Sequence, residues 1–175
     1  MPYAVTHILL TIIAVDLYRD YVAKHRKYFT LHTVLVAGIA GLLPDIDIPA
    51  NWLLGKLFPG AVPAFLAHGG ITHTPFFGLV FLIPALALWE RKKHKDAAYF
   101  FAASFGIFLH IFLDYVLGGG AHEGIMFFWP LSTAGFKIHL LNGLGLNDVP
   151  QGLDALILLA WLWHEEIKHK IKDFI

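Results

Sequence analysis

An apolar run of 21 residues, 97–117 (AAYFFAASFGIFLHIFLDYVL), restricts the fold of this chain more than any other feature. A helix needs about 20 mainly apolar residues to cross the roughly 30 Å hydrocarbon core of a membrane. The run meets that length and carries a single carboxylate, Asp114, near its end. It therefore predicts a membrane-embedded helix. Four shorter apolar segments predict four more helices, at 3–18, 31–46, 74–89 and 152–164.

The composition agrees with a membrane protein. The chain of 175 residues is 57% hydrophobic and 15% charged, whereas soluble domains are about 45–50% apolar and about 25% charged. We expect an all-α, polytopic integral membrane helix bundle of about five membrane-embedded helices in a single domain, 1–175. The absence of cysteine excludes disulfides, thiolate zinc sites and a cysteine nucleophile. Because 13 cations balance 13 anions, we expect no nucleic-acid partner.

Lysine and arginine are distributed unevenly along the chain. Eleven of the 13 fall in three stretches, 18–32, 90–96 and 168–172, which alternate with the five predicted helices. The other connections hold only Lys56 and Lys137. Basic connections face the cytoplasm in most membrane proteins. The pattern therefore predicts an N-terminus outside and a C-terminus in the cytoplasm.

The ionisable residues of the apolar segments gather at the predicted outer ends of the helices. With a rise of 1.5 Å per residue, His110 and Asp114 lie about 20 and 26 Å from a cytoplasmic helix start near residue 97. His7 enters from the outer side to a depth of about 10 Å. Ionisable groups in a membrane are costly and are candidates for function. The set that converges on this layer is His7, Asp45, Asp47, His68, His73, His110 and Asp114.

Two local patterns add detail to this layer. His110 and Asp114 are spaced i, i+4 on one helix face, which suits two ligands of one metal, a histidine oriented by a carboxylate, or a buried packing pair. Asp45 and Asp47 lie between Pro44 and Pro49. Since proline disfavours helix for the residue before it, we expect an extended stretch with both carboxylates on one side; a capping turn is the alternative.

A third pattern is the segment HGGITHTP, residues 68–75. Thr74 is expected to cap a helix that begins at Pro75. His73 then lies just before a helix N-terminus, where anions such as phosphate are favoured. Three residues of the outer connection, His122, Glu123 and His139, are further candidates whose part in the site the sequence leaves open.

Taken in order, His7, LLPDIDIP, AHGGITHT, LHIFLDY and FWP resemble the YdjM-like family of inner-membrane metal-dependent hydrolases, over about residues 5–131. Two positions depart from the family pattern: Gly69 stands where arginine is common, and Thr74 replaces serine. The His/Asp set is also more loosely similar to the zinc sites of phospholipase C and of fungal single-strand nucleases. The resemblance implies metal-binding or catalytic positions at His7, Asp45, Asp47, His68, His73, Thr74, His110 and Asp114.

These observations lead to a specific expectation. We expect a membrane-embedded metal-dependent hydrolase, of phosphoesterase type, acting on a lipid or lipid-linked substrate at the extracytoplasmic face of the inner membrane, with zinc (two or more ions) rather than manganese or iron. The expected metal ligands are His7, Asp45, His68, His110 and Asp114. Asp47 and His73 are further ligands or acid–base groups, and Thr74 supplies a hydroxyl. The alternatives are a metal or proton transporter and a non-catalytic membrane protein with a structural metal site.

Overall fold

The computed structural model describes residues 4–24, 28–58, 66, 68–117, 124–146 and 152–169. Within these ranges the fold is helical, with one isolated antiparallel bridge between Ile125 and Phe136. The helices are α1 (Ala4–Leu17), continued by a π-helical turn (Tyr18–Val22), α2 (Leu31–Ala40), α3 (Asp47–Leu57), α4 (Pro75–Glu90), α5 (His94–Leu117), α6 (Leu140–Gly143) and α7 (Leu153–His169). Two 3₁₀ turns, Pro44–Ile46 and Ile71–His73, precede α3 and α4.

The five apolar segments of the sequence each form a helix, namely α1, α2, α4, α5 and α7. Among the described residues, α5 alone is long and apolar enough to cross a membrane as a single helix. Residues Leu31–Ala40 and Pro44–Leu57 meet the same test together, with a bend of 47° between them, and Pro75–Glu90 is apolar but shorter. The all-α fold is thus confirmed, while the number of complete spans and their orientation stay predictions.

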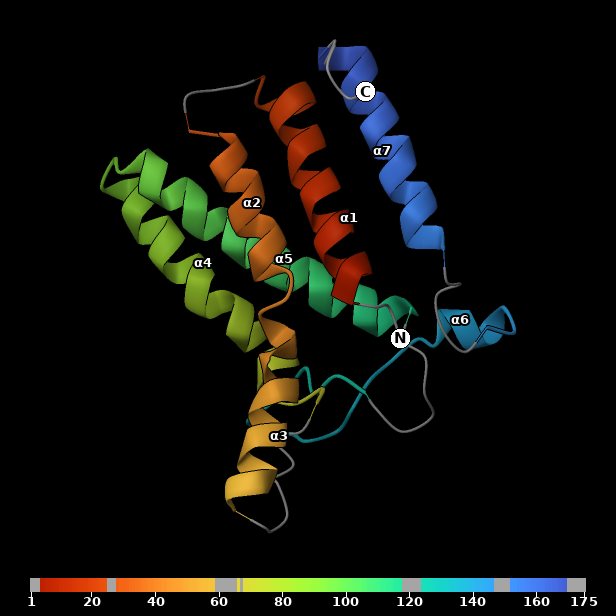
Figure 1. Ribbon diagram of the computed structural model, residues 1–175. Helices are drawn as coiled ribbons and strands as arrows, with labels where there is room; N and C mark the ends of the chain where they lie inside the picture. The colour runs from red at the N-terminus through yellow and green to blue at the C-terminus, as the bar shows by residue number, and fades with distance from the viewer. Residues whose placement is uncertain are drawn as a thin grey trace.

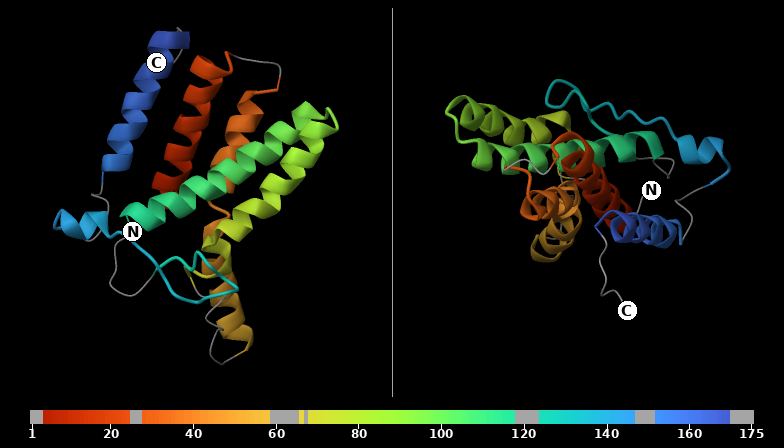
Figure 2. Two further views of the ribbon diagram at one scale, coloured as in Figure 1. Left: turned by 180° about the vertical axis from the view of Figure 1, so that it is seen from behind. Right: turned by 90° about the horizontal axis from the view of Figure 1, so that it is seen from above.

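Helix α5 is the centre of the packing. It lies against α4, α2 and α1, and α7 packs on the outer side of α1 (Figures 1 and 2). Small residues permit the closest approach: a Cβ on Gly106 of α5 would lie 2.4 Å from the carbonyl oxygen of Ala37 in α2. Small residues at such crossings are how membrane helices gain contact with one another. The α2–α5 contact in turn fixes where the ends of both helices meet.

A buried ionic network joins α1 to α7 at the opposite end of α1 from His7. The Arg19 guanidinium lies 3.0 Å from Asp16 and 3.1 Å from Asp20, and all three side chains are buried. The Lys168 ammonium of α7 lies 3.1 Å from the other oxygen of Asp20. Because these charges are paired, they can stay out of water. This network fastens α7 to the bundle at the predicted cytoplasmic end.

The expectation of an extended Asp45–Asp47 stretch is wrong. Residues Pro44–Ile46 form a 3₁₀ turn, and α3 begins at Asp47. Pro44 stands at the first position of the turn, where its missing N–H group is not needed, so that proline starts the turn instead of preventing it. The two carboxylates still converge, because they lie on the two sides of the His73 ring.

Candidate metal centre

All seven ionisable residues of the predicted layer lie together in the structure. They come from α1, the Pro44–Ile46 turn, the start of α3, the segment before α4, and α5. Five of the side chains are buried, whereas Asp45 and His68 retain 19% and 21% of their exposure and mark the open side. Among the described residues they form three overlapping triads whose ligand atoms lie within 4.8 Å of one another. The triads are His7–His110–Asp114, Asp45–His73–His110 and Asp47–His68–His73.

Four of these side chains present one atom each to a common point. Nε2 of His110 lies 3.2 Å from Oδ2 of Asp114, 3.3 Å from Nε2 of His73 and 3.5 Å from Oδ1 of Asp45. Nε2 of His73 lies 3.6 Å from each of the same two carboxylate oxygens. Metal–ligand bonds of 2.0–2.1 Å in tetrahedral geometry place ligand atoms about 3.3–3.4 Å apart. The five separations are close to this value, so these four donors, called the cage below, suit a zinc-sized divalent ion held by His73, His110 and one of the two carboxylates.

The histidines of the cage are oriented from behind by fixed acceptors. Nδ1 of His110 donates to the carbonyl oxygen of Gly41 at 2.6 Å, because a carbonyl oxygen can only accept. Asp47 accepts from Nδ1 of His68 and from the hydroxyl of Thr72, both at 3.1 Å, and lies 3.2 Å from Nδ1 of His73. Partners of this kind fix the tautomer and ring position of metal-ligating histidines. Asp47 is thus placed to orient His68 and His73.

His7 enters the centre from α1. Its ring stacks on that of His110 with 3.8 Å between centroids, and its Nε2 lies 3.3 Å from Oδ1 of Asp114. Asp114 therefore faces His7 with one oxygen and the cage with the other. His7 extends the donor set beyond four atoms.

His73, in the turn before α4, holds a proton strongly while no metal is bound. Burial opposes its charged form, but hydrogen bonds to the Asp45 and Asp47 carboxylates outweigh burial and raise the pKa of His73 to about 9. A metal that binds Nε2 of His73 must displace this proton. Metal binding at this residue would therefore release a proton.

The hydroxyl that faces the centre belongs to Thr72 and not to Thr74. Thr74 is the residue before α4 and Pro75 is the first helical residue, as predicted, but the Thr74 hydroxyl donates to the carbonyl oxygen of Ile71 at 2.8 Å. The sequence pattern gave no signal for Thr72. His139 belongs to none of the metal-ligating groups found among the described residues, and His122 and Glu123 lie outside those residues.

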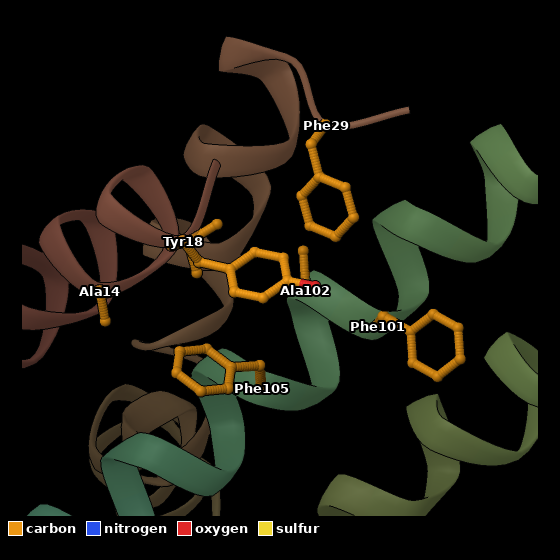
Figure 3. Close-up of a pocket in the computed structure, with 7 residues that line it drawn as sticks. Ala14, Tyr18, Phe29, Phe101, Ala102 and Phe105 are labelled. Atoms are coloured by element: carbon orange, nitrogen blue, oxygen red, sulfur yellow. The ribbon is translucent and has the colours of Figure 1, made fainter. Parts of the chain in front are cut away.

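Two cavities differ in character. A small one of about 10 Å³ opens onto the centre, and its lining includes His68, Asp114 and Lys137. A larger apolar one of about 330 Å³ lies between α1 and α5, and its lining contains no charged residue or histidine (Figure 3). The larger lining is Ala14, Val15, Tyr18, Phe29, Phe101, Ala102 and Phe105.

Comparison with known protein families shows to which family this chain belongs. The model of the YdjM inner membrane protein family matches residues 1–168. The chain belongs to the YdjM family. Membership supports a location in the inner membrane, in agreement with the apolar α5. No curated protein and no solved structure matches the chain.

Proposed function

We propose that this YdjM-family protein is a membrane-embedded, metal-dependent hydrolase of phosphoesters, with a lipid or lipid-linked substrate and a centre open to the extracytoplasmic side. The observation that carries the proposal is the cage, in which Nε2 of His73 and Nε2 of His110 lie 3.3 Å from each other and 3.2–3.6 Å from the carboxylate oxygens of Asp45 and Asp114. Imidazole nitrogens and carboxylate oxygens suit zinc first, and manganese or iron as alternatives.

The chemistry at such a centre divides between the ion and the protein. A divalent ion in the cage would lower the pKa of a water molecule towards neutrality and offset charge on a phosphoryl oxygen. His68 lies on the open side with its Nδ1 held by Asp47, which leaves Nε2 as the nitrogen with a lone pair. His68 is therefore the side chain best placed to accept a proton from water. Asp47 holds the His68 ring in that orientation and itself accepts a hydrogen bond from Thr72.

The larger cavity supports a lipid substrate. Most of its lining comes from the two helices that carry His7 and His110, with Tyr18 and Phe29 added from the segments after α1 and before α2. From Phe105 to His110 is five residues, or about 7.5 Å along α5, and from His7 to Ala14 is seven residues, or about 10 Å along α1. An acyl chain attached to a phosphate at the centre would be long enough to extend from the centre to this cavity. The apolar lining suits such a chain.

The decisive measurement is the metal content of protein purified without chelators. We expect a stoichiometric divalent metal in the native chain, its loss in His110→Ala and Asp114→Ala, and metal-dependent release of phosphate or alcohol from phospholipid substrates. His164→Ala is the matched control, because His164 contacts Tyr21 and Glu165 at the other end of the bundle. Native protein without metal would refute the proposal. Metal without hydrolysis would favour the structural-metal alternative.

One observation favours the transporter alternative. Asp16, Asp20 and Glu165 form a second acidic group, at the opposite end of α1 from His7, with ligand atoms within 4.8 Å. A transport path needs polar sites along the membrane. Arg19 and Lys168 already pair with this group, however, which favours a fastening role. Uptake of zinc into proteoliposomes that contain the native chain, and its loss in Asp16→Asn, would support transport.

A further inference from the structure

Lys137 lies at the mouth of the metal centre. It lines the small cavity together with His68, His73 and Asp114, and of the residues in that lining it is the one lysine, with no arginine present. Lys137 is partly buried, whereas most of the residues next to it in the sequence are exposed. The centre behind it holds three carboxylates and would hold one or more divalent ions. A cation at the entrance to a metal centre is placed to meet the anionic end of an incoming molecule.

The segment that carries Lys137 is fixed on both sides of the lysine. Ile125 and Phe136 exchange two backbone hydrogen bonds of 3.0 Å, and the Ile138 amide donates to the carbonyl oxygen of Tyr115, one residue beyond Asp114, at 2.9 Å. The residues before and after Lys137 are therefore fastened, one to residue 125 and one to the end of α5. This attachment holds the Lys137 backbone at a constant distance from Asp114.

Gly69 and Gly124 also line the mouth, beside the segment that carries Lys137. Gly69 has a φ of +83°, and a Cβ there would lie 2.9 Å from the carbonyl oxygen of Gly124. A Cβ on Gly124 would in turn lie 2.6 Å from the carbonyl carbon of Gly135. Close backbone contact of this kind leaves no room for side chains at these positions. These two positions therefore add no side chain to the mouth, and the positively charged side chain in its lining is that of Lys137.

We propose that Lys137 binds the anionic oxygen of the substrate, so that the centre selects a charged phosphoester over a neutral ester. This inference rests on the phosphoesterase function proposed above and adds the residue that recognises the charge. An ammonium group donates up to three hydrogen bonds and suits phosphate as a point charge. Lys137 is a binding residue in this account, while the cage and His68 act on the scissile bond and on water.

The test measures anion binding and metal content on the same samples. Dissociation constants for inorganic phosphate and for dodecyl phosphate in mixed micelles are determined by calorimetry, with divalent metal quantified in each sample. We expect Lys137→Ala to weaken both by about tenfold at unchanged metal content, which is about 1.4 kcal/mol. Lys137→Arg should restore part of the loss. Lys56→Ala is the control with the same change of charge, because Lys56 lies over the Trp52 ring on α3 at 3.9 Å.

The two probes, inorganic phosphate and dodecyl phosphate, distinguish a site for free phosphate from a site for a lipid headgroup. Weaker binding of both probes identifies a site for phosphate itself, and weaker binding of dodecyl phosphate alone identifies a site for a lipid headgroup. Unchanged binding of both probes in Lys137→Ala with full metal would overturn the inference. Tighter metal binding with unchanged phosphate binding would also overturn it, since Lys137 would then only balance the carboxylates. Native protein that lacks metal would instead refute the proposed function.

Discussion

The contact between Gly106 and α2 provides a sensitive test of the metal centre, because it acts on the cage from a distance. A Cβ on Gly106 would lie 2.4 Å from the Ala37 carbonyl oxygen and 2.9 Å from the Gly41 amide nitrogen. Both contacts are with backbone, so no side chain can turn away to make room. Gly106→Ala must therefore push α2 away from α5. His110, one turn further along α5, is bonded to that same Gly41.

The size of the effect follows from these distances. Ordinary van der Waals contact begins at 3.4 Å, so the Cβ–oxygen distance must grow by about 1 Å. If the shift reaches Asp45, the 3.5 Å edge between Asp45 and His110 opens to about 4.5 Å, which is too wide for ligand bonds of 2.0–2.1 Å. We expect metal affinity to fall by about 10–100-fold, as when supporting partners of a metal ligand are lost.

The cost in stability is smaller. Overpacking costs about 1–3 kcal/mol, and replacing glycine by alanine inside a helix returns up to about 1 kcal/mol. A net loss of about 1 kcal/mol would lower the unfolding midpoint by about 2–4 °C in a chain of this size. The midpoint can be followed in detergent by tryptophan fluorescence, and metal affinity by competition with a chromophoric chelator.

The control is Gly55→Ala on α3, because a Cβ on Gly55 meets nothing within 4 Å. It makes the same chemical change in a helix without crowding any neighbour. We expect its metal affinity to equal that of the native chain. If Gly106→Ala binds metal as tightly as the native chain, or if Gly55→Ala loses metal to the same degree, then the α2–α5 contact does not set the cage and the reasoning fails.

Three further predictions follow from other parts of the structure. Arg19→Ala removes the positive charge that pairs with the buried Asp16 and Asp20 carboxylates. Thermal unfolding should then show a loss of about 3 kcal/mol in the free energy of unfolding, with metal content unchanged. A loss of metal would mean that the network supports the centre. The pKa of His73 is raised to about 9 in the metal-free chain, so its proton is present at neutral pH and must leave when metal binds. The apparent metal affinity should therefore rise about tenfold per pH unit and level off above about pH 9. An affinity independent of pH in a metal titration would exclude His73 as a ligand. Ala14→Phe places a ring in the larger cavity, so hydrolysis of a long-chain phospholipid should fall relative to that of a short-chain one, and equal losses for both substrates would show that no acyl chain lies there.

The sequence predicts the helices well because apolar segments leave few alternatives in a membrane. Each of the five apolar runs contains a helix, and the bounds of α1, α4 and α5 lie within three residues of the expected ones. Helix α2 ends six residues before the expected end, at Ala40, and α7 continues five residues beyond it, to His169. The His110–Asp114 pair also follows from sequence, since the i, i+4 spacing on a helix fixes the relative positions of the two side chains, which lie 3.2 Å apart. The depth estimate from helix rise brought His7 to the same layer for the same reason.

Other parts of the site depend on contacts that residue types do not reveal. The acceptor for His110 is the Gly41 backbone, and every residue has a carbonyl oxygen, so nothing in the sequence marks this one. Thr72 faces the centre in place of the expected Thr74 because the 3₁₀ turn Ile71–His73 directs the two hydroxyls to different partners. The helical turn at Asp45 depends on Pro44 standing at its first position.

The hydrogen bond from His110 to Gly41 has a consequence for how many ions the centre can hold. With Nδ1 protonated, His110 has one lone pair, on Nε2, and a lone pair binds a single ion. Two of the triads require that nitrogen, and the middle triad shares His73 with the third. Ions in the middle triad and in the triad of His7, His110 and Asp114 would therefore exclude each other, since both need Nε2 of His110. A metal titration would then show at most one ion at His110 instead of the filling of two independent sites there.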